Sequence, residues 1–185
     1  LRMPFATVRA RAVGLPRSTW GTAIAHFGIG LTLLGIVSAS HWGSERIIAL
    51  KPGEVTTIRH YELTFDGMIS RQGPNYHEQV AKFTVRRNHE TLAGATPSKR
   101  SFDARGTTTT EAALITRGLS QLYFSLGEVN ADGSVAVRIY YKPLVLLIWL
   151  GAVVMAFGGA LSLSDRRLRV GAPKPAAKPA MAPGE

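Results

Sequence analysis

The sequence predicts a membrane protein in which two transmembrane helices flank an all-β domain, built as a small sandwich or an open barrel. Two apolar runs predict the helices. The first lies between Arg17 and Glu45 and the second between Lys142 and Asp165, and neither contains a charged residue. Runs of β-branched and aromatic residues between the two predict the strands.

These patterns divide the chain into five segments. A helix of about 20 residues rises roughly 30 Å, enough to cross the hydrocarbon core of a bilayer. Trp20 and Trp42 bracket the first run as interfacial anchors. Pro143 can take the first position of the second helix. The expected segments are a basic arm at 1–19, transmembrane helices at 20–41 and 144–164, the β domain at 42–143, and a basic, Pro/Ala-rich tail at 165–185.

The distribution of charge predicts the orientation of the helices. The net charge is +10, but the 13 basic and 10 acidic residues of the β domain leave it only mildly positive. The first segment has four arginines and no acidic residue, and the tail is also basic. Short flanks rich in Lys and Arg stay in the cytoplasm. Both termini are therefore expected in the cytoplasm and the β domain outside, and the pattern does not indicate nucleic-acid binding.

The segment between the helices predicts seven or eight short strands. ERIIAL and EVTTIRHYELTF are rich in β-branched and aromatic residues. HEQVAKFTVRR alternates, which places Ala81, Phe83 and Val85 on one face. LYFSLGE and SVAVRIYY flank the turn sequence NADG and predict a hairpin. Further turns are expected at KPGE, DGM, RQGPN and TPSK.

One stretch of the β domain is ambiguous. In TTTTEAALITRGL, Thr108 and Glu111 have the spacing of a helix capping box, whereas the threonine run favours a strand. A single helical turn near 116–121 remains an expectation. The chain has no cysteine, so disulfides and thiolate chemistry are excluded.

His26 is the one ionisable residue in the interior of the first apolar run, because His41 lies at its outer end beside Trp42. Ionisable residues inside a membrane are costly and usually face protein or a cavity. At 100° per residue, Thr22 and Gly30 share the face of His26. The residue could hydrogen-bond a neighbouring helix, ligate a haem or metal, or relay protons. Neither run has another histidine in its interior, so a second axial ligand would have to come from elsewhere.

Small residues occupy the other side of the same helix. Gly21, Gly28 and Gly35 recur every seven residues, opposite His26. Such a row lets a second helix approach closely. The second run carries Gly151 and Gly158 at the same interval. We therefore expect helix packing along this row.

Sites in the β domain are less distinctive. The loop RQGPNYHEQ offers Arg71, Tyr76 and His77 to an acidic group, or is simply solvated. The sequence contains no nucleophile elbow, phosphate-binding loop or HExxH metal motif. The chain is therefore not expected to be a self-sufficient enzyme.

Three stretches, in order, resemble the C-terminal end of CcmF-type cytochrome c biogenesis proteins, the haem lyase subunits of bacterial cytochrome c maturation. They are AHFGIGLTLLGI, TEAALITRGLSQLYFSLGE and VAVRIYYKPLVLLIWLGAVVMAFGGALSLSDRR, within about residues 18–170. The last is the most specific. The resemblance implies that the chain is the final part of such a protein, either as a piece of it or as a separate subunit.

The resemblance also implies a cofactor. Family members hold a haem b between two intramembrane histidines, and the motif around one of them matches Ala25-His26-Phe27-Gly28. His26 is then an axial ligand of the haem iron, shared with a second histidine outside this chain. Thr22 and Gly30 would lie near the porphyrin. The chain would serve the complex that joins haem to apocytochrome c, as part of the haem lyase (cytochrome c synthase).

The same resemblance implies a location and partners. The chain would lie in the bacterial inner membrane with its β domain in the periplasm. Its partners would be membrane lipid, apocytochrome c, the rest of the CcmF-type protein, and other maturation subunits, including the haem chaperone and apocytochrome-handling proteins. The alternative is a cofactor-free, two-span membrane anchor that presents the β domain as an assembly scaffold.

Overall fold

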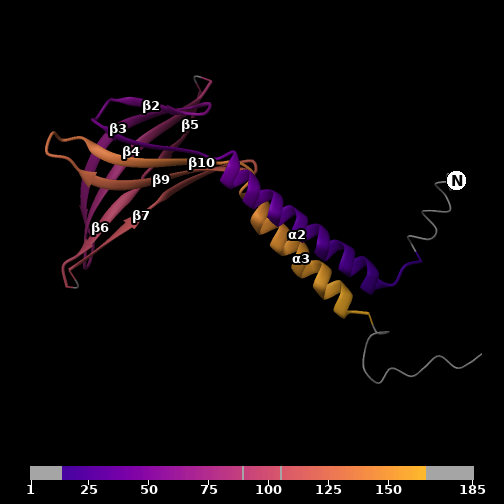
Figure 1. The fold of residues 1–185 in the computed structure, drawn as a ribbon. Helices are drawn as coiled ribbons and strands as arrows, with labels where there is room; N and C mark the ends of the chain where they lie inside the picture. The colour runs from indigo at the N-terminus through magenta and orange to yellow at the C-terminus, as the bar shows by residue number, and fades with distance from the viewer. Residues whose placement is uncertain (1–13, 89, 105, 166–185) are drawn as a thin grey trace, which may run out of the picture. The chain divides into compact units, whose positions relative to one another are not determined.

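The computed structural model describes residues 14–88, 90–104 and 106–165. The expected basic arm before residue 14 and the expected tail after residue 165 lie outside the described residues. Among those described, residues 31–150 form one compact unit, and residues 14–30 and 151–165 belong to another. The elements in chain order are α2 (Arg17–His41), β1 (Ser44–Leu50), β2 (Val55–Ile58), β3 (Tyr61–Gln72), β4 (His77–Arg87), β5 (Glu90–Ala95), β6 (Ser98–Phe102), β7 (Thr107–Glu111), β8 (Ala113–Arg117), β9 (Ser120–Val129), β10 (Val135–Lys142) and α3 (Leu146–Leu163) (Figure 1).

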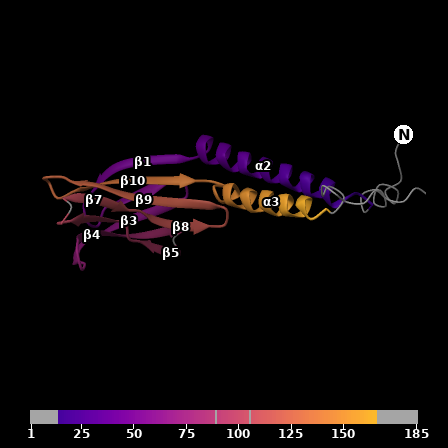
Figure 2. The same ribbon diagram turned by 90° about the horizontal axis from the view of Figure 1, so that it is seen from below.

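The strands form two antiparallel sheets. One sheet has four strands in the order β1-β10-β9-β8. The other has six, in the order β2-β3-β4-β6-β7 with β5 paired to β4. Figure 2 shows β9 and β10 side by side, as their register from Tyr140 opposite Tyr123 to Val135 opposite Val129 requires. The all-β expectation is confirmed.

Phenylalanines from the two sheets build the core between them. Phe65 on β3 stacks on Phe83 of β4, with ring centroids 5.1 Å apart. Phe83 also contacts Phe124 of β9 in the other sheet, at 5.7 Å between centroids. All three are buried, and full burial of one such ring contributes about 1.5–3 kcal/mol to folding. Ala81, Phe83 and Val85 point inward, as the alternation in β4 predicts.

The structure has more strands than the sequence predicts, for two local reasons. EVTTIRHYELTF does not form one strand, because Ile58 pairs with Tyr61 across a two-residue turn made of Arg59 and His60. TTTTEAALITR forms both β7 and β8, so its capping-box interpretation is wrong. The expected helical turn near 116–121 is also wrong, since residues 118 and 119 form the turn of the β8–β9 hairpin.

The predicted turns at KPGE, RQGPN and NADG are present, whereas those at DGM and TPSK are wrong. At TPSK the chain passes from β5 to β6 without reversing, since Ala95 lies opposite Phe83 and Ser98 opposite Val80 of the same strand β4. The NADG sequence closes the β9–β10 hairpin, where the Asn130 backbone N–H donates to the Ser134 carbonyl at 2.8 Å. At DGM the chain continues as strand β3. Its register against β4 shifts between Phe65 and Gly67, and Gly67 has a φ of 130° that other residues rarely adopt. The glycine therefore marks a β-bulge and not a turn.

A short connection joins the sandwich to α3. The helix begins at Leu146, so Pro143 lies in the preceding turn and not at the first helical position, which corrects the sequence expectation. Leu144 has a positive φ of 52°. The Leu146 backbone N–H donates to the Leu119 carbonyl at 3.2 Å, so the β8–β9 turn satisfies one of the N–H groups left free at the helix start.

Both helices are long and apolar enough to cross a membrane. The 25 residues of α2 correspond to roughly 37 Å and the 18 residues of α3 to roughly 27 Å. Large apolar side chains remain exposed along them, including Phe27, Trp149 and Phe157. These exposed faces are suited to lipid or to further helices, but not to water.

Candidate functional site

His26 presents its ring at the surface of α2. The ring Nδ1 lies 2.8 Å from the Thr22 carbonyl oxygen, one turn earlier in the helix. A carbonyl oxygen can only accept, so Nδ1 carries the proton and donates it to Thr22. In the neutral ring this leaves the lone pair of Nε2 free and directed away from its own backbone. Hydrogen bonding at one nitrogen is the usual way a ligating histidine is oriented.

Thr22 and Gly30 lie on the same exposed face as His26, one turn before and one turn after it. Thr22 supplies the carbonyl that orients the ring. A Cβ built on Gly30 would meet no described atom within 4 Å. The helix face is thus open beside the imidazole, and a flat ligand could approach the backbone at Gly30 closely.

The opposite face of α2 packs against α3 through its glycines. A Cβ built on Gly28 would lie 2.7 Å from the Gly151 carbonyl oxygen, and one built on Gly21 would lie 2.5 Å from the Ser162 nitrogen. Within residues 31–150, a Cβ on Gly35 would lie 2.8 Å from the Ile148 nitrogen. Since real Cβ atoms do not approach this closely, only glycine fits, and the predicted row of small residues is confirmed.

The start of α2 is capped from the end of α3. The Ser18 backbone N–H donates to the Asp165 carboxylate at 3.1 Å. The first turn of α2 has no acidic residue of its own. Asp165 supplies the negative charge that a helix N-terminus favours. Two independent contacts, the glycine row and this cap, therefore hold the helices together on the side away from His26.

The donor set on this face fits one axial position of a haem. Imidazole is a common haem ligand, the Nε2 of His26 contacts no other residue in the described ranges, and the helix offers space beside it. The described residues do not supply a second ligand on the helices, because α3 has no histidine and His41 lies at the far end of α2. The face could therefore provide half of a six-coordinate site.

The β domain contains a charged cluster of a different kind. The largely buried Glu78 carboxylate accepts from Ser98 Oγ at 2.7 Å and from Arg100 Nε at 2.9 Å. These hydrogen bonds, first from Ser98 and then from Arg100, lower the pKa of Glu78 below its ordinary value. Arg100 also lies over the Tyr76 ring and near Glu111. Since every partner is another protein group, the cluster serves to join β4, β6 and β7.

The loop that the sequence singled out has its own partners. His77 Nε2 lies 3.0 Å from the Asp103 carboxylate. The Tyr76 ring packs against Phe102 with centroids 5.6 Å apart. Of the three residues in this loop that could have bound an acidic group, Tyr76 and His77 are therefore used in contacts within the domain.

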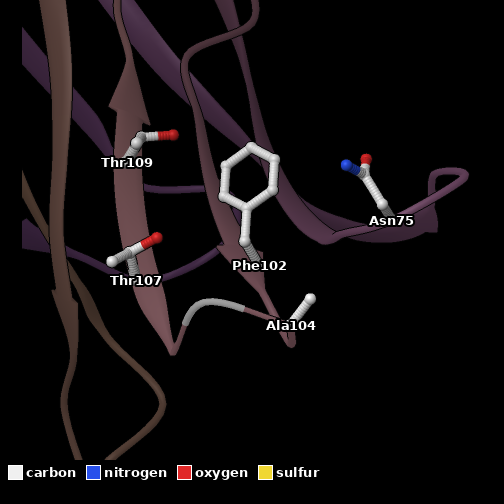
Figure 3. Close-up of a pocket in the computed structure, with 5 residues that line it drawn as sticks. All are labelled: Asn75, Phe102, Ala104, Thr107 and Thr109. Carbon is white, nitrogen blue, oxygen red and sulfur yellow. The ribbon is translucent and has the colours of Figure 1, made fainter.

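A hollow of about 320 Å³ lies near the same end of the six-stranded sheet. Figure 3 shows the Phe102 ring between the two threonines of β7 and Asn75. None of the described lining residues can ionise, so none of them could act as a general acid or base. The residues that line it are Asn75, Phe102, Ala104, Thr107 and Thr109.

Comparison with known proteins gives consistent matches. The family model described as "CcmF C-terminal beta-sandwich" matches residues 41–143. The cytochrome c-type biogenesis protein CycK of Bradyrhizobium diazoefficiens is 61% identical over all of this chain and 28% of its own length. CcmF of Pseudomonas aeruginosa is 37% identical over 88% of this chain and 25% of its own length.

A solved structure shares the fold. The protein described as "Cytochrome c Heme Lyase CcmF" superimposes with a TM-score of 0.66 at 18% sequence identity, covering 89% of this chain and 26% of its own. The present chain thus spans about a quarter of the length of the relatives it matches.

Proposed function

This chain belongs to the CcmF C-terminal β-sandwich family, and we propose that it forms the C-terminal helix pair and β domain of a haem lyase in cytochrome c maturation. In this proposal His26 supplies one axial nitrogen to an intramembrane haem b, and a histidine outside the chain supplies the other. One observation carries the proposal: His26 is exposed, its Nδ1 is bonded to the Thr22 carbonyl, and its Nε2 has no partner among the described residues.

The division of α2 into two faces supports this assignment. The glycine face packs against α3, so His26 does not serve helix packing within the described part of the chain. An exposed imidazole facing only lipid would be costly. A partner group must therefore cover it, and a metal with an open axial position satisfies Nε2 directly.

Each residue on this face has a separate role. Thr22 accepts the Nδ1 proton, which fixes the tautomer and the ring orientation. Gly30 leaves room for a flat macrocycle. In the membrane, lipid and the partner that covers His26 would exclude water from its Nε2. A bound haem b would supply one-electron chemistry, which suits the reduction of haem iron before its attachment to a cytochrome.

We further propose that both helices span the bacterial inner membrane with the β domain on the periplasmic side. The basic residues before Thr19 and after Ser164 favour cytoplasmic ends. The sandwich lies between the two helices in the sequence, so it would be held at the opposite surface. There it could meet apocytochrome c, a haem chaperone and other maturation subunits.

The test is a reduced-minus-oxidised optical spectrum of the natural protein that carries this chain, purified in full with its partner subunits. Wild type should show a six-coordinate b-type signal. His26→Ala should lose or shift it at equal protein yield. His41→Ala, at the end of the same helix, is the matched control and should retain it. Equal spectra in wild type and His26→Ala would refute the ligand assignment and favour a cofactor-free scaffold.

A further inference from the structure

A cationic cavity lies where two hairpin turns of the six-stranded sheet meet. Its volume is about 270 Å³. The β2–β3 turn contributes Arg59 and the end of β4 contributes Arg87. Three arginines and one acidic residue give the lining a net positive charge. The residues that define its chemistry are Arg59, His60, Tyr61, Glu62, Arg86 and Arg87.

The arginine charges are only partly neutralised by protein groups. The Arg87 guanidinium lies over the Tyr61 ring, 5.7 Å from its centroid, and Arg59 donates to a backbone carbonyl. Arg86 is 4.0 Å from Glu62, at the limit of an ion pair. Among the described residues, no carboxylate pairs with Arg59 or Arg87. Their remaining N–H donors are therefore available to an anion.

Arg59 holds an unfavourable backbone conformation. Its φ is 54°, in the left-handed region where glycine or asparagine is preferred in two-residue hairpin turns. Asn88, which also lines the cavity, has a φ of 51° and is suited to it. An arginine gains nothing from this conformation by itself. A strained residue of this kind points to a role for its side chain.

The side chain of Arg59 links the cavity to the end of α2. Arg59 Nη2 donates to the Trp42 carbonyl at 2.9 Å. Trp42 directly follows the last residue of α2 and its ring is exposed. In the membrane orientation proposed above, on which this inference rests, Trp42 lies at the bilayer interface. The hydrogen bond therefore places the cavity at the level of lipid headgroups.

We propose that this cavity binds the phosphate of an anionic phospholipid headgroup, with Arg59 and Arg87 as its principal donors. Guanidinium groups match the geometry of phosphate oxygens and pair with them through two hydrogen bonds. The bound headgroup would attach the β domain to the outer surface of the membrane. It would do so beside the point at which α2 enters the sandwich.

The test measures phosphatidylglycerol bound to the natural full-length protein in detergent, by native mass spectrometry during a lipid titration. Phosphatidylcholine serves as the lipid without net charge. The key variant is Arg59→Gly, since glycine accepts the positive φ and the turn should fold at least as well. Arg87→Gln is the second variant. Arg138→Gln is the control, because Arg138 pairs with Glu45 on the other sheet and does not line the cavity.

Arg59→Gly and Arg87→Gln should each weaken phosphatidylglycerol binding by roughly tenfold, the effect of one lost charge-assisted contact. Arg138→Gln should not. Unchanged binding in both cavity variants, or an equal loss in Arg138→Gln, would overturn the proposal. So would inorganic phosphate that binds the cavity more tightly than phosphatidylglycerol does, which would mean that the cavity takes a free anion.

The haem spectrum of the same samples separates this proposal from the proposed function. Weaker lipid binding with an unchanged b-type signal supports the lipid site alone. A wild type that binds the lipid but has no b-type signal refutes the haem assignment and leaves the lipid site standing. If Arg59→Gly binds the lipid as wild type does but loses haem, the cavity would instead hold a carboxylate group of the haem. That result would overturn the lipid proposal.

Discussion

The contact between α2 and α3 can be tested with two adjacent glycines of α3. A Cβ built on Gly158 would lie 2.5 Å from the Ala25 nitrogen and 2.7 Å from the Gly21 carbonyl oxygen. A Cβ built on Gly159 would meet nothing within 4 Å. Alanine at either position brings the same gain in helix propensity, about 1 kcal/mol in a soluble helix. The difference between the two variants therefore isolates the helix contact.

The magnitude follows from these distances. An ordinary Cβ contact begins at 3.4 Å, so Gly158→Ala must push the helices apart by about 0.9 Å near Ala25. The opposing atoms are backbone, which cannot rotate away. A gap of this size removes a quarter to a half of the dispersion energy of each nearby contact. Overpacking of this kind costs about 1–3 kcal/mol.

The assay is the apparent Tm of the natural protein in detergent, followed by loss of the monodisperse peak in size-exclusion chromatography. Gly158→Ala should lower the Tm by up to a few degrees, since the shift is roughly 2–4 °C per kcal/mol at 150–250 residues and smaller in a longer protein. Gly159→Ala should leave it unchanged or slightly raised. Equal Tm values for the two variants would refute the close packing of α2 on α3.

Three further predictions concern stability. Asp165→Ala should lower the Tm, because the Ser18 N–H at the start of α2 loses its acceptor, which typically costs about 1 kcal/mol. Asp165→Asn should lower it less, because the amide oxygen can still accept this hydrogen bond. Ser38→Ala should be neutral or stabilising in the same assay, because Ser38 Oγ is buried and finds no hydrogen-bond partner among the described residues. The lowered pKa of Glu78 means that its ion pair stabilises the β domain fully above about pH 4.5 and that this contribution is lost as the pH falls through the depressed folded-state pKa. Protease resistance of the β domain against pH should therefore show an acid-dependent loss that is smaller in Glu78→Gln, and an identical pH profile in that variant would contradict the assignment.

The helices and the core of the sandwich could be predicted because their signals are periodic. Uncharged runs marked α2 and α3, and alternation marked the inward face of β4 at Phe83. The seven-residue spacing of Gly21 and Gly28 located the face of α2 that packs on α3, and therefore also the opposite, exposed face that carries His26. These features depend on local sequence, which is why the sequence alone was sufficient.

Other features depend on contacts that local patterns do not encode. The β2–β3 turn was missed because Arg59 and His60 carry no turn signal, and the turn is imposed by pairing of Ile58 with Tyr61. Gly67 appeared to mark a turn but forms a bulge, because its neighbours continue to pair with β4. The cap by Asp165 joins residues 147 positions apart in the sequence, so only the folded structure could reveal it.

The most direct test of the central claim is the haem midpoint potential of His26→Met in the natural protein, by spectroelectrochemical titration beside wild type. Thioether ligation favours ferrous iron, and axial ligands tune haem potentials over about 0.8 V. If His26 is an axial ligand, the potential should rise by on the order of 100 mV and the oxidised spectrum should change. A variant that retains the wild-type potential and spectrum would show that His26 does not bind the iron.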